Sequence, residues 1–302
     1  MSKIDSSDFK PGDPMSVIEK RIEGAEHSLG DFSVRRVLPS PQARMVGPFI
    51  FFDEFGPAEF DAGHDLGVRA HPHIGLATVS YLFEGAIQHK DSLGFDQRIT
   101  PGAVNWMVAG EGIVHSERTP DDVIKTGQRL HGLQIWLALP KEHEQTEPSF
   151  SHHPADSLPH SVEAGVQWTV VLGSAFDTCS PVPVFSPCFY VDVRLEAGAH
   201  IAMPMQYQDR ACYPIDGALS ANGEPIAPNT LSLFKPDVPV VLEAAKPSRL
   251  IILGGAPLEG RRHLFWNFVA SDPALITRAK ERWAKGLFPT VPGEDEFIPL
   301  PD

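Results

Sequence analysis

The 302-residue sequence predicts an all-β protein that is built from a duplicated unit and ends in one helix. Three observations support this prediction. The chain has 25 glycines and 29 prolines, a high content that favours short strands joined by tight turns. Short apolar or alternating runs recur along the chain and are bounded by Gly, Pro or Asp, as strands are. The two halves also share sequence features.

The first half reads as an N-terminal arm followed by a strand-rich domain. Residues 1–14 are polar and are expected to be held loosely, so the first domain is predicted to span residues 15–140. Its expected strands are FSVRRVL (32–38), GPFIFFDEF (47–55), ATVSYLF (77–83), AVNWMVA (103–109) and LQIWLALP (133–140).

A polar stretch rich in Pro, Ser, His and acids then predicts a linker at residues 141–165. The second domain is predicted at residues 166–302. Its expected strands are VQWTVVLG (166–173), FYVDVRL (189–195), NTLSLF (229–234), VPVVLEA (238–244) and RLIILGGAP (249–257).

One helix is predicted at about residues 272–285. Asp272 is a suitable N-cap, and Pro273 suits the first helical position. Apolar residues up to Trp283 repeat at helical spacing, and Gly286 ends the pattern. The apolar stripe is therefore expected to pack on a sheet.

The duplication is clearest around a turn glycine in each half. The HPH segment 71–73 precedes Gly85 by the same distance as the MPM segment 203–205 precedes Gly217. This correspondence indicates a duplicated all-β unit in which one copy carries imidazoles where the other carries thioethers.

Composition excludes several classes of function. A formal net charge of -14 argues against direct nucleic-acid binding, which needs clustered Lys and Arg. Cys179, Cys188 and Cys212 are odd in number and lack CxxC spacing, which favours reduced core residues over disulfides. A secretory signal and a membrane-length apolar segment are both absent from the sequence, so a soluble cytoplasmic protein is expected.

Two histidine-containing pairs are the strongest functional signal. His71 and His73 are two residues apart, so on a strand both side chains face the same way. His115 and Glu117 have the same spacing. If the two segments are neighbours in a sheet, three imidazoles and one carboxylate converge on one ion. An H-x-H segment also arises by chance, and structural histidines are the competing interpretation. However, all four equivalent positions in the second half are apolar.

Such a ligand set would suit a reactive rather than a structural metal ion. Imidazole and carboxylate bind Fe(II), Mn, Co, Ni, Cu or Zn, and four protein ligands leave about two positions open on an octahedral ion. A structural zinc site would instead be closed, usually by thiolates. Pro72 fixes its own φ and favours an extended His71, which orders both imidazoles in advance.

The sequence resembles the pirin family of the cupin superfamily over nearly the whole chain after about residue 15. The resemblance rests on residues 71–85, 89–94, 99–117, 131–140 and 265–273. It implies two cupin β-barrels of the jelly-roll type in tandem, with metal only in the first. The family's ligands map onto His71, His73, His115 and Glu117, with Fe(II) the usual ion. Ala77 departs from the Glu that many relatives carry.

The resemblance implies two kinds of function. Some pirins are dioxygenases that open flavonols such as quercetin with O2 and release CO, which would make this chain an oxidoreductase. Others bind transcription factors or metabolic enzymes, so a metal- or redox-responsive regulator is the alternative. For catalysis we expect a small aromatic or enediol-like substrate, with Glu117 as the base. His64, His89 and Asp91 are candidates for the surrounding pocket, against an ordinary role in loop hydrogen bonding.

Overall fold

The computed structural model describes residues 16–28 and 33–301, so the predicted arm at 1–14 lies outside the described residues. Each of the ten expected runs contains a strand, and the all-β class with one long C-terminal helix is confirmed. The described chain folds into two units. Among the described residues, the HPH unit is drawn from 26–28, 33–36, 49–157 and 258–301, and the MPM unit is drawn from 16–25, 37–48 and 158–257.

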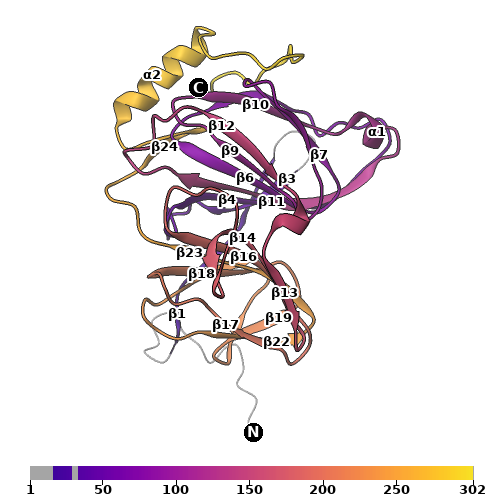
Figure 1. Cartoon of the computed structure of the whole chain (residues 1–302), viewed down its shortest axis with the longest axis vertical. Helices are drawn as coiled ribbons and strands as arrows, with labels where there is room; N and C mark the ends of the chain where they lie inside the picture. The colour runs from indigo at the N-terminus through magenta and orange to yellow at the C-terminus, as the bar shows by residue number, and fades with distance from the viewer. Residues whose placement is uncertain (1–15, 29–32, 302) are drawn as a thin grey trace. The chain divides into compact units, whose positions relative to one another are not determined.

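The HPH unit contains two main antiparallel sheets, besides a two-stranded hairpin described below (Figure 1). The larger sheet has the order β12 (Ser149–His153), β9 (Val104–Val108), β6 (Leu76–Glu84), β11 (Gln128–Ala138), β4 (Phe49–Phe60), β3 (Ser33–Leu38) and β2 (Ala25–Ser28). The smaller sheet has the order β5 (Val68–His73), β10 (Ile113–Arg118), β7 (Ile87–Asp91) and β8 (Asp96–Ile99). The short helices α1 (Asp121–Ile124) and η2 (Ala155–Ser157) lie in its loops.

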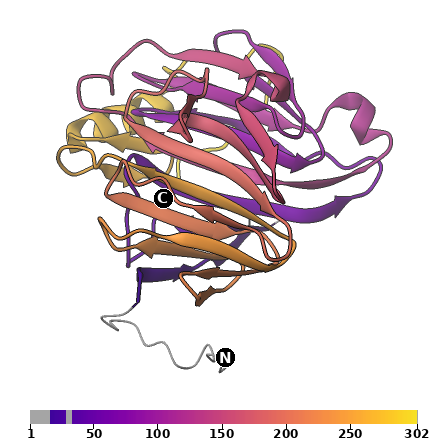
Figure 2. The same ribbon diagram turned by 60° about the horizontal axis from the view of Figure 1, so that its bottom comes forward.

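The MPM unit repeats this plan, and Figure 2 shows its strands in pink to orange except for β1, which is indigo. Its larger sheet has the order β1 (Ile18–Glu23), β21 (Thr230–Phe234), β18 (Asp209–Pro214), β23 (Ser248–Gly255), β16 (Cys188–Leu195), β14 (Val166–Ala175) and β13 (His160–Glu163), with β15 (Thr178–Cys179) on β14. Its smaller sheet has the order β17 (His200–Ala202), β22 (Val241–Lys246), β19 (Ala218–Ala221) and β20 (Glu224–Ile226).

The interior of the MPM unit is apolar where the HPH unit is polar. Leu242 and Ala244, the positions equivalent to His115 and Glu117, are fully buried in its hydrophobic core. Met203 is buried in the same core, whereas Met205 is 48% exposed. The two units therefore share one architecture, and only the HPH unit carries imidazoles at these positions.

The C-terminal segment returns to the HPH unit. A hairpin of β24 (His263–Phe265) and β25 (Phe268–Ala270) precedes α2 (Pro273–Ala284). The Asp272 side chain accepts a hydrogen bond from the Ala274 N–H, which confirms the predicted N-cap. Ile276 and Ala279 of α2 are buried in one cluster that also contains β5 and β10 side chains, so the predicted apolar stripe does pack on a sheet.

The domain limits expected at 140 and 166 remain a prediction. Residues 141–165, expected as a linker, contain β12, which pairs with β9, and β13, which pairs with β14. Within the described part of the chain, the helices are all too short or too polar to cross a membrane.

Candidate metal centre

Strands β5 and β10 place the histidines. The strands pair antiparallel with His115 opposite His71 and Ile113 opposite His73, so these side chains share one face. On the other face, Ala70, Ile74 and Val114 pack in the apolar cluster with α2. The strand alternation therefore turns the imidazoles inward, as the H-x-H spacing predicted.

Three imidazoles converge on one point. The Nε2 atoms of His73 and His115 are 3.1 Å apart, and the ring centroids of His71 and His115 are 4.4 Å apart. Each of the three side chains can offer one nitrogen within 4.8 Å of the others, and all three residues are buried. Among the described residues, these three histidines are the only cluster of His, Cys, Asp or Glu side chains that could hold a metal ion.

Burial keeps these imidazoles neutral. It lowers the pKa of His71 to about 4, and it lowers the pKa of His73 and His115 well below 6.5 with a further contribution from the neighbouring imidazoles. The Nδ1–H of His71 donates to the Arg69 carbonyl at 2.8 Å, which leaves its Nε2 lone pair available. Neutral imidazoles with converging lone pairs are the donor set of a divalent transition metal, so the residues fit such an ion.

Glu117 lies on the wall of the same cavity but outside the close group of donors. A bulge in the β5–β10 pairing falls between His115 and Glu117 and sets Glu117 opposite Val68. Its Oε1 accepts a hydrogen bond of 3.3 Å from the Ser80 hydroxyl, which also lies 2.8 Å from the Gln134 amide oxygen. Burial raises the pKa of the Glu117 carboxyl.

The cavity in front of the histidines has a volume of ≈ 420 Å³ and walls that are mostly apolar. His71, His73 and Glu117 line it together with the aromatic side chains of Phe51, Trp136 and Trp266. A polar group at the base of an apolar, concave pocket is the usual form of a small-molecule site.

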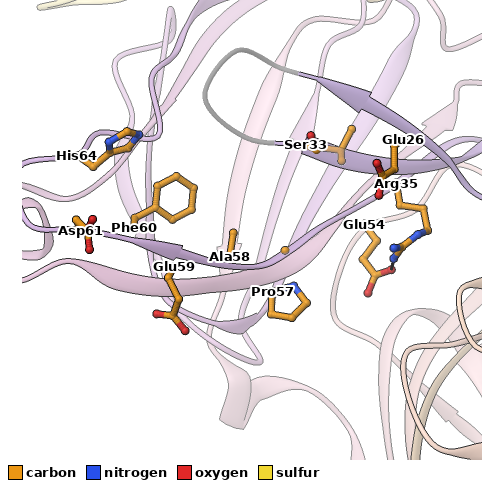
Figure 3. Close-up of a pocket in the computed structure, with 12 residues that line it drawn as sticks. Glu26, Ser33, Arg35, Glu54, Pro57, Ala58, Glu59, Phe60, Asp61 and His64 are labelled. Carbon is orange, nitrogen blue, oxygen red and sulfur yellow. Dashed lines mark hydrogen bonds and ion pairs between the residues drawn. The ribbon is translucent and has the colours of Figure 1, made fainter.

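A second pocket, of ≈ 390 Å³, lies along β4 and lacks this chemistry (Figure 3). Its Glu54 is engaged by Arg35 at 3.1 Å and by His131 at 2.9 Å. His64, a sequence candidate for the metal pocket, lines this second pocket beside Phe60. We therefore assign the functional site to the histidine cavity.

Comparison with known proteins now identifies the family. The family model "Pirin" matches residues 31–137, and the model "Pirin C-terminal cupin domain" matches residues 190–289. The chain belongs to the pirin family. A pirin-like protein of Caulobacter vibrioides is 44% identical over 95% of this chain and 100% of its own length. Pirin of Rattus norvegicus is 31% identical over 74% of this chain and 77% of its own.

The pirin fold is also matched by solved structures. The crystal structure of a quercetin 2,3-dioxygenase from Acinetobacter baumannii has a TM-score of 0.86 and 32% identity, covering 94% of this chain and 95% of that one. The prediction of two cupin domains is thus confirmed. In the described residues, each unit has two main antiparallel sheets that remain separate and do not form one closed barrel sheet.

Sequence reasoning missed several residues of the candidate site. Ser80 and Gln134 contact each other beside Glu117 and come from neighbouring strands of the large sheet. Trp266 and Asn267 line the cavity from the C-terminal hairpin. The motif at residues 265–273 is part of the family resemblance, but the sequence alone assigns no role to its residues.

Proposed function

We propose that this chain is a mononuclear metal-dependent dioxygenase that opens a flavonol such as quercetin with O2 and releases CO. The observation that carries the proposal is the convergence of His71, His73 and His115, the first two of which line an aromatic-walled cavity. Similarity to the Acinetobacter baumannii quercetin 2,3-dioxygenase supports it.

The three histidines would hold the ion, with Glu117 as a fourth ligand from the cavity wall. We propose Fe(II), although the donor set also accepts Mn, Co, Ni, Cu or Zn. When bound, the ion supplies a Lewis acid that lowers the pKa of a coordinated substrate hydroxyl.

The chain's own residues would bind the substrate and move its proton. Phe51, Trp136 and Trp266 offer aromatic surfaces to a planar substrate. Glu117 would accept the hydroxyl proton, because its raised pKa brings the carboxylate closer to the pKa of the group that it deprotonates. The Ser80 hydroxyl would orient the carboxylate. The mostly apolar walls would limit reprotonation of the substrate anion by water.

A single experiment tests the activity. The iron-loaded protein is incubated anaerobically with quercetin, air is admitted, and the flavonol absorbance band and the released CO are followed. Loss of the band with CO release is expected, whereas a persistent band in protein shown to contain metal would favour a regulator that binds another protein. Elemental analysis of the purified protein identifies the ion. The free thiols of Cys179, Cys188 and Cys212 suit a reducing compartment, so we propose the cytoplasm as its location.

A further inference from the structure

His89 lies behind His115, on the side away from the other two imidazoles. Strand β7 pairs with β10 so that Asp91 is opposite His115 and His89 is opposite Glu117, which puts all four side chains on one face. His115 turns its Nε2 toward His73 at 3.1 Å and its Nδ1 toward the Nδ1 of His89 at 3.3 Å. The His89 Nε2 in turn lies 3.0 Å from Oδ2 of Asp91.

This row of side chains is rigidly held. His89 and Asp91 are 3% and 0% exposed. The Asp91 Oδ1 accepts hydrogen bonds from the backbone N–H groups of Leu93 at 2.9 Å and Phe95 at 3.1 Å. Phe150 stacks on the His89 ring with centroids 4.4 Å apart and planes 16° apart. The orientations of Asp91 and His89 are therefore fixed by groups outside the metal cavity.

The hydrogen-bond partners determine where the protons are. A carboxylate only accepts, so the His89 Nε2 must carry the hydrogen that Asp91 receives. In a neutral His89 the Nδ1 is then an acceptor, and the His115 Nδ1 must donate to it. The lone pair of His115 is thereby placed on Nε2, the nitrogen that faces His73.

We propose that Asp91 and His89 are positioning residues that lock His115 in the tautomer that can ligate metal. The proposal rests on the metal site of the proposed function. It gives His115 a side-chain relay for the task that the Arg69 carbonyl performs for His71. Outer partners of ligating histidines generally fix ring orientation and tautomer in this way, and their loss costs about 10- to 100-fold in metal affinity.

The variant Asp91→Asn tests the relay with almost no change in shape. The N–H groups of Leu93 and Phe95 need an acceptor, so the amide oxygen stays on their side and the amide NH2 faces His89. The His89 Nε2 must then accept, its Nδ1 must donate, and the hydrogen of His115 moves to Nε2. Long-range 1H–15N spectra of metal-free protein should show this hydrogen on Nδ1 in the wild type and on Nε2 in the variant.

Metal binding provides the second measurement. Calorimetric titration with Ni(II) should show about 10- to 100-fold weaker binding for Asp91→Asn and His89→Leu, and partial recovery for His89→Asn, which keeps an acceptor near His115. His131→Leu is the matched control, because His131 is a buried histidine that pairs with Glu54 at 2.9 Å and belongs neither to the donor group nor to the cavity lining. It should bind Ni(II) like the wild type.

The outcomes separate the two proposals. An unchanged His115 tautomer in Asp91→Asn, or wild-type Ni(II) affinity in both Asp91→Asn and His89→Leu, overturns the relay. If the wild type itself fails to bind Ni(II), the proposed metal function fails, while the spectra of the metal-free protein still decide the tautomer.

Discussion

Phe51 and Trp136 face each other across β4 and β11, and their rings stack with centroids 3.8 Å apart and planes 10° apart. The rings of Trp136 and His73 are nearly perpendicular, and their centroids are 5.1 Å apart. The Arg36 guanidinium lies 4.4 Å from the centroid of the Phe51 ring. The bidentate pair of Arg36 with Asp53 holds this guanidinium in place. One continuous row of rings thus runs along the cavity wall to a proposed metal ligand.

This row predicts that Phe51→Leu affects substrate binding more than turnover. An aromatic pair contributes about 1 kcal/mol beyond the area that it buries, so the free energy of unfolding in urea should fall by at least about that amount. Phe51→Leu also removes an aromatic contact with the bound substrate. Loss of about 1 kcal/mol of this contact should raise KM for quercetin about fivefold, with a smaller change in kcat. Phe83→Leu is the control, because Phe83 is buried on β6 outside the cavity and should lose stability without a change in KM. An unchanged KM in Phe51→Leu would exclude the row as a substrate surface.

The histidine pattern was predictable because strand alternation is a local property. The spacing of His71 and His73 fixes their common face, and the register with His115 needs only that β5 and β10 be neighbours. His89 and Asp91 share the same spacing, so their place beside the site also follows from alternation.

The C-terminal wall of the cavity was not predictable in this way. Trp266 lies far along the sequence from His73. Its hairpin is held beside the site by backbone contacts with Ile74, which forms a bridge with Phe268 and accepts a hydrogen bond from the Val269 N–H. No local period encodes such a contact. Met205 shows the same limit. It occupies the position equivalent to the buried His73, yet it is 48% exposed beyond the end of β17.

Glu117→Gln should separate metal binding from turnover. The amide keeps an oxygen on the cavity wall but cannot accept the substrate proton, so kcat should fall about 10²- to 10⁴-fold while some Ni(II) binding remains. Glu294→Gln is a matched control, because Glu294 bonds Ser116 and Arg118 rather than lining the histidine cavity. It should leave quercetin turnover close to that of the wild type. Full activity in Glu117→Gln would remove the assignment of Glu117 as the base.

Acid should destabilise the metal-free protein through the buried imidazoles. The folded-state pKa of His71 is about 4 because of burial, whereas an unfolded histidine titrates near 6.5. Between these values the unfolded chain binds the proton and the folded chain does not, so stability is complete above about pH 6.5 and falls as the pH drops toward about 4. For His71 alone the loss is roughly 3 kcal/mol.

Urea unfolding in the presence of a chelator at several pH values measures this dependence. His71→Gln replaces the titrating group and should have a shallower decline below about pH 6.5 than the wild type. His160→Gln changes a more exposed histidine and should keep the wild-type slope. Parallel curves for the wild type and His71→Gln would show that His71 does not stay neutral in the folded protein.

The cysteines should differ sharply in reactivity. Cys188 and Cys212 are buried, as expected for core residues. Cys179 is exposed, so the expectation of a core position is wrong for this cysteine. Burial raises the pKa of Cys188 to about 12 and also raises the pKa of Cys212.

Since the thiolate is the nucleophile, native protein that is treated with iodoacetamide at mildly alkaline pH should carry one label when it is measured by mass spectrometry. Cys179→Ser should take up none, and guanidinium-unfolded wild type should take up three, one for each cysteine. Rapid labelling of two or more thiols in the native protein would mean that the core of the MPM unit opens on the timescale of the reaction.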